Sequence, residues 1–333
     1  IDTIAAFKKM IAEAQQFVRQ VYIPDLLAVA SCYMDWAGHG GGVGNYMEYG
    51  EYPLDDEADP ELFIKSGVIR NKDLSKIEPI DPSKITEQVA HSWYDYEGGD
   101  SEALHPSQGQ TNPNYTGPEP PFERLDTANG YSWLKSPRYD GQPMEVGPLA
   151  RMLVNYAQGH EKVQGLVNYV LETLGVGPEA LFSTLGRVAA RGIETQLLVD
   201  KIGDFVDELA DNMGKGELRI HDNSKWDPET WPKDSMGAGF HEAPRGALGH
   251  WVHVKDAKIA RYQCIVPSTW NAGPRDAGDT PGPYEAALVG TPVADPEQPI
   301  EILRTVHSFD PCMACGVHVV EPGGREVTRV KAR

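Results

Sequence analysis

Hydrophobic side chains recur at steps of three and four over residues 2–36, a spacing that places them on one face of a helix. The run passes through Ile4, Phe7 and Ile11. Pro24 interrupts it, and proline both lacks an amide hydrogen and collides with the preceding helical turn. The pattern therefore predicts a helical N-terminal segment that is kinked or split near this proline.

The same spacing returns in residues 143–214, where we expect three helices. The first begins near Pro148, and the second covers about residues 160–174 and ends at the glycines that follow. The third begins at Pro178, a favoured first-turn residue, and runs to Met213. At about 1.5 Å per residue it spans on the order of 50 Å, a length typical of the central helix of a bundle.

Two later segments alternate between apolar and polar positions, which predicts strands. They are residues 248–254 and 259–266, and residues 255–258 would join them as a hairpin. Residues 300–309 have the composition of a short helix that would end just before Asp310.

Residues 51–142 are rich in Pro, Gly, Asp and aromatic side chains, which predicts short strands and long irregular connections. The aromatic side chains favour a segment that packs onto a larger body over a disordered one. Residues 37–50 are dense in glycine, but no Lys-Ser/Thr follows and no strand–loop–helix context surrounds them, so we reject a phosphate-binding loop. The expected fold class is α+β, mainly α with small β elements around a bundle of long helices.

The composition is that of a globular protein, since 40% of the 333 residues are hydrophobic and 24% are charged. No apolar run reaches the roughly 18 residues of a transmembrane helix. The N-terminus has neither an initiator Met nor the features of a secretion signal, so we expect a processed chain or a piece of a longer one. The net charge of −19 argues against a nucleic-acid partner, because phosphate binding needs clustered Lys and Arg.

The cysteines are too few for a disulfide scaffold. Cys32 lies in an apolar helical run, where we expect a small buried side chain. Cys312, Cys315 and His318 follow one another at intervals of three, so two thiolates and an imidazole could hold one soft metal ion. The spacing also fits a redox dithiol, although a thioredoxin-like context is missing, or two reduced buried cysteines. Spacing alone leaves a zinc site, a redox pair and a buried thiol pair open.

The residues around this motif resemble the C-terminal signature of nickel–iron hydrogenase large subunits. The signature extends from Ser308 to His318, with Asp-Pro-Cys-x-x-Cys-x-x-His at its end. Residues 242–246 (Glu-Ala-Pro-Arg-Gly) and 266–271 (Val-Pro-Ser-Thr-Trp-Asn) resemble two further blocks of that family, in the family's order. The likeness runs over essentially the whole chain and has the character of the uptake and periplasmic enzymes. It implies the long-helix bundle core of a hydrogenase large subunit.

By this resemblance the chain carries one side of a nickel–iron site whose iron holds CN and CO ligands. Cys312 would be the terminal nickel ligand and a proton acceptor, and Cys315 would bridge nickel and iron, a role that suits soft thiolates. Arg245, held by Asp310, would lie over the open metal positions and polarise H2, because a guanidinium is always charged. Pro244 would line the same canopy.

The resemblance also implies a pocket for the iron ligands and a magnesium site. Ser268 and the peptide at Pro267 would donate hydrogen bonds to a cyanide on iron. His318 would bind magnesium, and the backbone carbonyl of Cys264 would complete that site, so the thiol of Cys264 would have no role there. The other histidines show no ligand spacing, and we expect surface or hydrogen-bonded positions for them.

Two features depart from the family pattern. The family's second nickel-binding pair, in an Arg-x-Cys-Gly-x-Cys block, has no counterpart in this sequence. Residues 1–318 are therefore expected to be the C-terminal portion of a large subunit, folded as a single domain. Residues 319–333 resemble an extension that a dedicated protease removes on maturation, by cleavage between His318 and Val319. The sequence is thus that expected of an unprocessed precursor.

The implied function is that of the catalytic subunit of a hydrogenase, which oxidises H2 reversibly and heterolytically to protons and electrons. The electrons would pass to iron–sulfur clusters of a small subunit, since this chain has too few cysteines for its own. A maturation protease and nickel-insertion proteins would be further partners. The resemblance places the enzyme in the periplasm or at the membrane, exported with the small subunit and attached through other subunits.

One alternative from another class is a metal-free scaffold or assembly fragment, related to such a subunit and inactive alone. The missing second cysteine pair favours it for the isolated chain. Subunits of energy-converting complexes share the ancestry but usually lose the cysteines. Because Cys312 and Cys315 are both present, the sequence argues against that branch.

Overall fold

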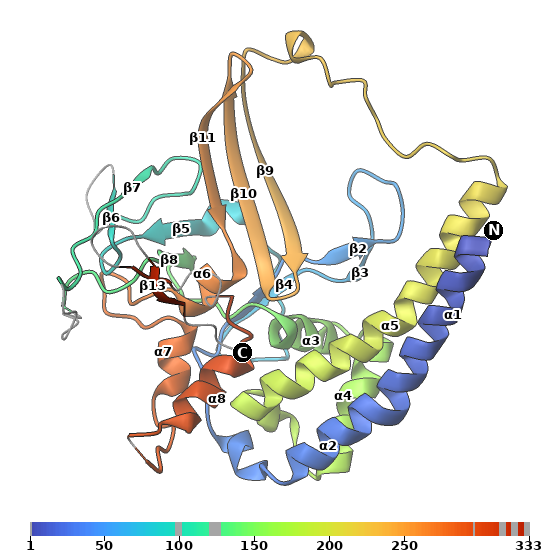
Figure 1. The fold of residues 1–333 in the computed structure, drawn as a ribbon, viewed down its shortest axis with the longest axis horizontal. Helices are drawn as coiled ribbons and strands as arrows, with labels where there is room; N and C mark the ends of the chain where they lie inside the picture. The colour runs from blue at the N-terminus through green and yellow to red at the C-terminus, as the bar shows by residue number, and fades with distance from the viewer. Residues whose placement is uncertain are drawn as a thin grey trace.

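Long helices gather on one side of the molecule, and small antiparallel sheets lie on the other (Figure 1). The computed structural model describes residues 2–96, 102–119, 128–295 and 297–312, and the backbone of 318–320 and 326–329. Its α-helices are α1 (Asp2–Phe17), α2 (Ile23–Ser31), α3 (Pro148–Ala157), α4 (Glu161–Leu174), α5 (Thr184–Gly214), α6 (Pro267–Ala272), α7 (Pro283–Leu288) and α8 (Ile300–Ser308). Its strands are β1 (Tyr46–Glu48), β2 (Glu51–Pro53), β3 (Leu62–Ile64), β4 (Gly67–Ile69), β5 (Ile85–Gln88), β6 (Tyr94–Tyr96), β7 (Thr111–Pro113), β8 (Ser136–Tyr139), β9 (Asp234–Ala243), β10 (Gly246–Lys255), β11 (Lys258–Ile265), β12 (His318–Val320) and β13 (Glu326–Arg329).

The N-terminal helical segment is split, as its sequence predicts. A π-helical turn, Val18–Tyr22, joins α1 to α2, and Pro24 follows in the first turn of α2. The wider π turn accommodates a residue that cannot donate a backbone hydrogen bond. In Figure 1, α1 lies beside α5 and runs in the opposite direction. Arg19, in the π-helical turn, donates a hydrogen bond to Asp200 on α5.

The three helices expected in residues 143–214 are present, but the third begins later than its sequence predicts. Pro178–Leu181 is a separate 3-10 turn, and α5 starts at Thr184. The hydroxyl of Ser183 accepts the amide hydrogen of Gly186 and caps the new helix, so the serine rather than the proline fixes its start. Neither α5 nor any other helix in the described ranges is long and apolar enough to cross a membrane.

Two hydrophobic cores hold these layers together. The first joins α3, α4 and α5 and includes the fully buried Leu153 and Ile193. The second lies beneath β10, β11 and α6 and includes Met47, Ile265 and Trp270. Because burying one large apolar side chain contributes about 1.5–3 kcal/mol, the second core fixes the elements that carry the candidate site.

The sheet β9–β10–β11 projects from the body of the molecule (Figure 1). The predicted hairpin of β10 and β11 is confirmed, with Lys255 opposite Lys258 and positive φ at Asp256 and Ala257 between them. The third strand, β9, pairs antiparallel with β10 along its whole length and was not predicted. Most of its side chains are exposed, so it lacks the alternation that indicates a half-buried strand.

The glycine-rich segment after α2 packs closely against the start of α5. The carbonyl of Gly40 accepts a hydrogen bond from Arg187, and that of His39 accepts one from the amide of Thr184. A Cβ atom on Gly40 would lie 2.1 Å from the Thr184 hydroxyl oxygen, and Gly40 has a φ of +78°. Close backbone approach therefore explains the glycine at this position.

Cys32 departs from its prediction. It caps the C-terminal end of α2 and is exposed, with its Sγ 3.7 Å from the carbonyl oxygen of Ala28. The apolar pattern of the helix was assigned correctly, but its last turn faces outward, so the prediction of a buried thiol is wrong.

Candidate metal centre

Arg245 lies in the tight turn between β9 and β10 and reaches the segment that follows α8. Its Nε donates to the backbone carbonyl of Asp310 at 2.8 Å, and its Nη2 donates to the Asp310 carboxylate at 3.3 Å. The predicted helix before Asp310 is confirmed as α8, and Asp310 itself has a left-handed backbone with a φ of 57°. That conformation directs the chain out of the helix toward Cys312, so Arg245 holds the segment that carries this cysteine.

Two glycines allow the Arg245 turn to approach the start of α3. Gly147 precedes α3 and Gly246 begins β10. A Cβ atom on Gly246 would lie 2.5 Å from the amide nitrogen of Gly147, and one on Gly147 would lie 2.7 Å from the carbonyl oxygen of Arg245. Any side chain at either position would force the two backbones apart.

A buried guanidinium fixes the same turn from below. Arg151 on α3 donates to the backbone carbonyls of Ala243 and Pro244 at 3.0 and 2.9 Å. Its other hydrogen bonds go to the carboxylates of Glu194 on α5 and Glu242 on β9. Arginine can serve several acceptors at once because its donors are rigidly spread, so Arg151 joins a helix, a strand and the turn.

Ser268 contacts the cysteine segment from the opposite side. It lies with Pro267 in the first turn of α6, and both are buried. The Oγ of Ser268 accepts the backbone amide hydrogen of Cys312 at 3.3 Å, while Cys312 is exposed. The structure thus brings Arg245 and Ser268, predicted from separate sequence blocks, onto the one segment that carries Asp310 and Cys312.

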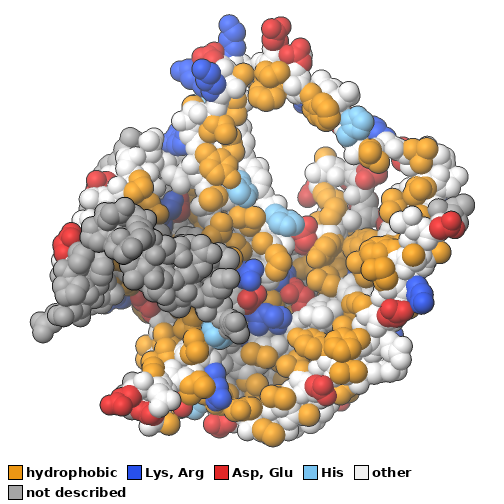
Figure 2. Space-filling model, in the orientation of Figure 1, with side chains coloured by type: hydrophobic (Ala, Val, Ile, Leu, Met, Phe, Trp, Pro, Cys, Tyr) orange, Lys and Arg blue, Asp and Glu red, His pale blue; other side chains and the backbone are white. Residues whose placement is uncertain are grey.

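A cavity of about 350 Å³ opens beside this arrangement. Asp310 and Pro244 form part of its wall, and Arg151, Glu194 and Glu242 form another part. Basic and acidic side chains meet near the centre of the face in Figure 2, between the projecting sheet and α5. The candidate centre therefore adjoins a charged hollow rather than an apolar one.

The remaining predicted site residues are described only in part. Cys315 lies outside the described residues, and His318 and Val319 are described only by their backbone in β12, which pairs with β13. Cys264 lies in β11 opposite His250. Burial raises the pKa of the Cys264 thiol, which keeps that thiol neutral and disfavours it as a metal ligand. The predicted roles of these residues stay predictions.

The donor set suits one side of a soft-metal centre. Cys312 offers an exposed sulfur, with a fixed hydroxyl and a guanidinium on the elements around it. Nickel and iron sites accept thiolates readily, and the hydrogen-bonding groups around them tune the ligands. Within the described ranges, however, no three His, Cys, Asp or Glu side chains lie close enough together to hold a metal ion. The described residues thus fit part of such a centre.

The buried charges on α3 and α5 were not predicted from the sequence. Arg187 on α5 forms a fully buried ion pair with Glu145, and Glu194 on the same helix pairs with Arg151. Arg187 and Glu194 are seven residues apart, two helical turns, and share the buried face with Ile193. Charged residues on an otherwise apolar helix face were the signal that could have revealed them.

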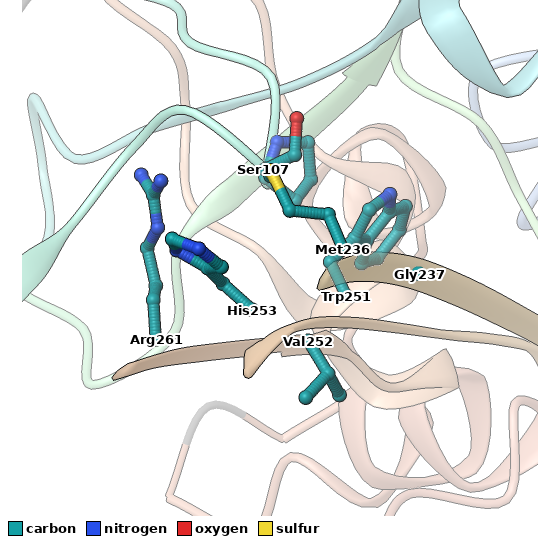
Figure 3. Close-up of a pocket in the computed structure, with 8 residues that line it drawn as sticks. Ser107, Met236, Gly237, Trp251, Val252, His253 and Arg261 are labelled. Carbon is teal, nitrogen blue, oxygen red and sulfur yellow. The ribbon is translucent and has the colours of Figure 1, made fainter. Parts of the chain in front are cut away.

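A second pocket lies on the projecting sheet, away from the candidate centre. It has a volume of about 220 Å³, and Figure 3 shows Ser107, Met236, Trp251, His253 and Arg261 around it. His253 pairs with Asp234, and Arg261 donates to the carbonyl of Gln108. These polar groups are engaged in structural contacts, so the pocket adds no reactive group.

Comparison with known sequences identifies relatives along the whole chain. Residues 1–318 match the family described as nickel-dependent hydrogenase. The uptake hydrogenase large subunit of Bradyrhizobium diazoefficiens is 45% identical over 331 residues, which cover 96% of this chain and 55% of that protein. The hydrogenase-1 large chain of Escherichia coli is 40% identical over 345 residues, which cover 100% of this chain and 58% of that protein. The chain therefore spans a little more than half the length of these relatives.

Solved structures agree with the sequence matches. The reduced Ni-Fe-Se hydrogenase of Desulfovibrio vulgaris Hildenborough superposes with a TM-score of 0.76 and 33% identity, over 95% of this chain and 61% of that chain. The Ni-Fe-Se hydrogenase of Desulfomicrobium baculatum gives a TM-score of 0.74 and 34% identity. These matches confirm the predicted α+β fold of the large-subunit type. The chain belongs to the nickel-dependent hydrogenase family and corresponds to part of its large subunit.

Proposed function

We propose that this chain forms the C-terminal side of the catalytic centre in a hydrogenase large subunit that oxidises H2 reversibly to protons and electrons. One observation carries the proposal: Arg245 and Ser268, from two separate elements, converge on the segment of Asp310 and Cys312. The resemblance predicts that convergence, and membership of the nickel-dependent hydrogenase family supports it.

Cys312 and Cys315 would hold nickel, and Cys315 would also contact iron. When bound with CN and CO ligands, the two metals would supply the place where the H–H bond is split and two electrons are accepted. This sequence contains one closely spaced cysteine pair, so the remaining thiolates would come from another part of the large subunit. An iron–sulfur small subunit would accept the electrons, and nickel-insertion proteins would load the site.

The side chains on this segment would manage charge and protons. The Cys312 sulfur would hold the proton released from H2, because a thiolate beside a metal is basic enough to accept one. The guanidinium of Arg245 remains charged and would polarise H2 rather than remove its proton. Asp310 would keep that guanidinium over the cysteine segment.

Ser268 would orient an iron-bound cyanide. The hydrogen bond recorded at its Oγ uses an oxygen lone pair, because Cys312 is the donor. A serine hydroxyl also has one hydrogen to donate, which leaves it available for a nitrogen lone pair. The buried position of Ser268 would strengthen that bond, since water competes less there.

The same proposal includes magnesium, processing and location. His318 and the carbonyl of Cys264 would bind magnesium, although imidazole is an unusual partner for that ion.

Cleavage after His318 would remove residues 319–333, and the family match that ends at residue 318 supports this boundary. The enzyme would act in the periplasm or at the membrane. The missing second cysteine pair favours a metal-free scaffold only for the chain in isolation, and the relatives, which are hydrogenase large subunits, do not support that alternative.

A cysteine variant with a matched control tests the function. In the holoenzyme with its small subunit, we expect Cys312→Ala to abolish H2-dependent dye reduction, because the proposed nickel ligand and proton acceptor is lost. Cys32→Ala removes an exposed cysteine at the end of α2 and should leave the rate unchanged. Full activity in Cys312→Ala would contradict the assignment.

A further inference from the structure

Three buried carboxyl groups lie near Arg151, behind the Arg245 turn, and interact electrostatically. Glu48, Glu242 and Glu194 are 0%, 7% and 9% exposed, respectively. Arg151 bonds two of them, and Arg191 lies on the Glu194 side of the group. The group therefore holds two positively charged guanidinium groups and three carboxyl groups that could each carry a negative charge. Because an uncompensated charge is costly in a dry interior, the three carboxyl groups cannot all be ionised.

Glu48 is the member that lacks an ionic partner. One oxygen accepts a hydrogen bond from the Asn155 amide at 2.7 Å, and the other is buried and has no hydrogen-bond partner. In the described part of the chain, no Lys or Arg nitrogen lies within ion-pair distance of it. Burial, together with the charge of Glu242, raises the pKa of Glu48 well above its ordinary value. Burial without a cation penalises the charged carboxylate more than the neutral acid, so these surroundings favour the neutral form.

Glu242 stands between Glu48 and the cavity. Its carboxylate accepts hydrogen bonds from the Tyr49 amide and from Arg151, each at 2.8 Å, and it also lines the cavity. Burial raises the pKa of Glu242 to about 7, although Arg151 and the Tyr49 amide act in the opposite direction. A carboxyl group with that pKa can accept and release a proton near neutral pH.

The cavity leads from Glu242 to the candidate centre. Asp310, which precedes the cysteine segment, forms part of the same wall. The cavity has a volume of about 350 Å³, whereas one water molecule needs roughly 30 Å³. Water molecules in the cavity can therefore connect Glu242 to Asp310. Three further titratable groups face the space, namely Glu51, Tyr52 and His241.

We propose that Glu48 and Glu242 form a buried proton-holding pair, in which Glu48 stays a neutral acid and Glu242 exchanges a proton with the cavity. A proton that leaves the candidate centre would add to the Glu242 carboxylate, and the resulting acid would release it to water in the cavity. The balance needs no other reactant, because a single proton moves and no electron does. The source of that proton rests on the proposed function, whereas the protonation states of the pair do not.

Infrared spectroscopy of the full chain tests the protonation of Glu48. A neutral carboxylic acid gives a C=O stretch above the amide band that shifts in heavy water, and an ionised carboxylate gives none there. We expect this band at a pH well above 7, where Glu242 is ionised, and we expect Glu48→Gln to remove it. Glu87→Gln is the control, because Glu87 is equally buried but pairs with Lys135, and it should leave the band intact. A wild-type spectrum without the band, or a band that survives in Glu48→Gln, overturns the proposal.

Thermal unfolding gives an independent answer if a band is hard to resolve. A neutral acid at Glu48 means that the folded chain takes up a proton at neutral pH, which glutamine does not require. We therefore expect the melting temperature of Glu48→Gln to rise relative to that of the wild type as the pH increases from acidic to neutral. The opposite trend would show an ionised Glu48 and would overturn the proposal.

Exchange at Glu242 is tested by titration and by turnover. The acid band of Glu242 should grow as the pH falls through about 7 and should be missing in Glu242→Gln. In the holoenzyme, Glu242→Gln should move the pH profile of H2 oxidation, with its metal content unchanged. If the infrared titration or the pH profile of H2 oxidation is the same in Glu242→Gln as in the wild type, the exchange is refuted. If the wild-type holoenzyme does not oxidise H2, the proposed function is refuted, but the infrared result for Glu48 stands.

Discussion

Arg245 bonds Asp310 twice, through the backbone carbonyl at 2.8 Å and through the carboxylate at 3.3 Å. The first bond survives any replacement of the Asp310 side chain, and the second carries the negative charge. Placement of the cysteine segment and the electric field at Arg245 can therefore be changed separately. This separation gives the first test of how the arginine acts.

Asp310→Asn should retain the fold and impair the proposed reaction. The two side chains are 36% and 42% exposed, and an ion pair so accessible to solvent contributes about 1 kcal/mol or less. We expect the free energy of unfolding to change by no more than that, while H2 oxidation falls on the order of tenfold or more because the guanidinium loses its charged anchor. Chemical denaturation and dye reduction provide the two values. A loss of several kcal/mol in stability would instead assign Asp310 a structural role.

Ser268→Ala should affect both the cysteine segment and the iron ligands. The Cys312 amide would lose its acceptor, which costs about 1 kcal/mol. In the holoenzyme, the cyanide stretch should shift, because one hydrogen bond to the nitrogen would be missing. Infrared spectroscopy measures that shift, and Thr269→Val, at the next buried position of α6, provides the control. Cyanide bands that do not move would remove Ser268 from the iron pocket.

Local patterns in the sequence predicted the candidate site better than they predicted the structure around it. The blocks that contain Arg245 and Ser268 were assigned to one centre from their residues, and both contact the cysteine segment. Arg151 was missed because its partners lie on a distant helix and strand, and no short pattern links those elements. The strand β9 was missed because both its faces are largely exposed. Its sequence therefore does not alternate between apolar and polar residues, which is the pattern that predicts a half-buried strand.

The late start of α5 also depends on contacts that the local sequence does not reveal. Both Pro178 and Ser183 are good first residues for a helix, and propensity alone does not choose between them. In the folded chain, the Ser183 hydroxyl bonds the amide of Gly186, and Thr184 contacts the glycine-rich segment. Contacts with a segment more than a hundred residues away thus decide where the helix begins.

Arg151→Met should destabilise the protein strongly. The substitution keeps much of the side-chain volume but leaves Glu194 and Glu242 buried without their cation, and it frees two carbonyls of the Arg245 turn. Breaking a buried ion pair in this way costs about 3–5 kcal/mol. Denaturant unfolding of the full chain measures the loss.

A surface arginine supplies the comparison for that experiment. Arg19 pairs with Asp200 at the surface, and Arg19→Met should change the free energy of unfolding by about 1 kcal/mol or less. Equal losses of unfolding free energy in Arg151→Met and Arg19→Met would show that the buried Arg151 ion pairs stabilise the protein no more than a surface pair does.

The stability of the chain should depend on pH through Glu242. Its folded pKa of about 7 lies above the ordinary value of 4.5, so the folded state binds the proton more tightly than the unfolded state does. This contribution is fully present below about pH 4.5 and is lost as the pH rises through about 7. The slope is at most about 1.4 kcal/mol per pH unit for one proton. Plots of the free energy of unfolding against pH for the wild type and Glu242→Gln should differ in slope by up to this amount between about pH 4.5 and 7. Equal slopes across that range would contradict the assignment.

The nickel environment of the holoenzyme tests the central claim most directly, because that claim makes the Cys312 sulfur a nickel ligand. X-ray absorption at the nickel edge distinguishes sulfur from oxygen neighbours. We expect Cys312→Ser to replace one sulfur neighbour of nickel by oxygen, or to leave the protein without nickel, while Cys32→Ser keeps the wild-type spectrum. A Cys312→Ser enzyme with nickel bound and its sulfur coordination unchanged would contradict the account.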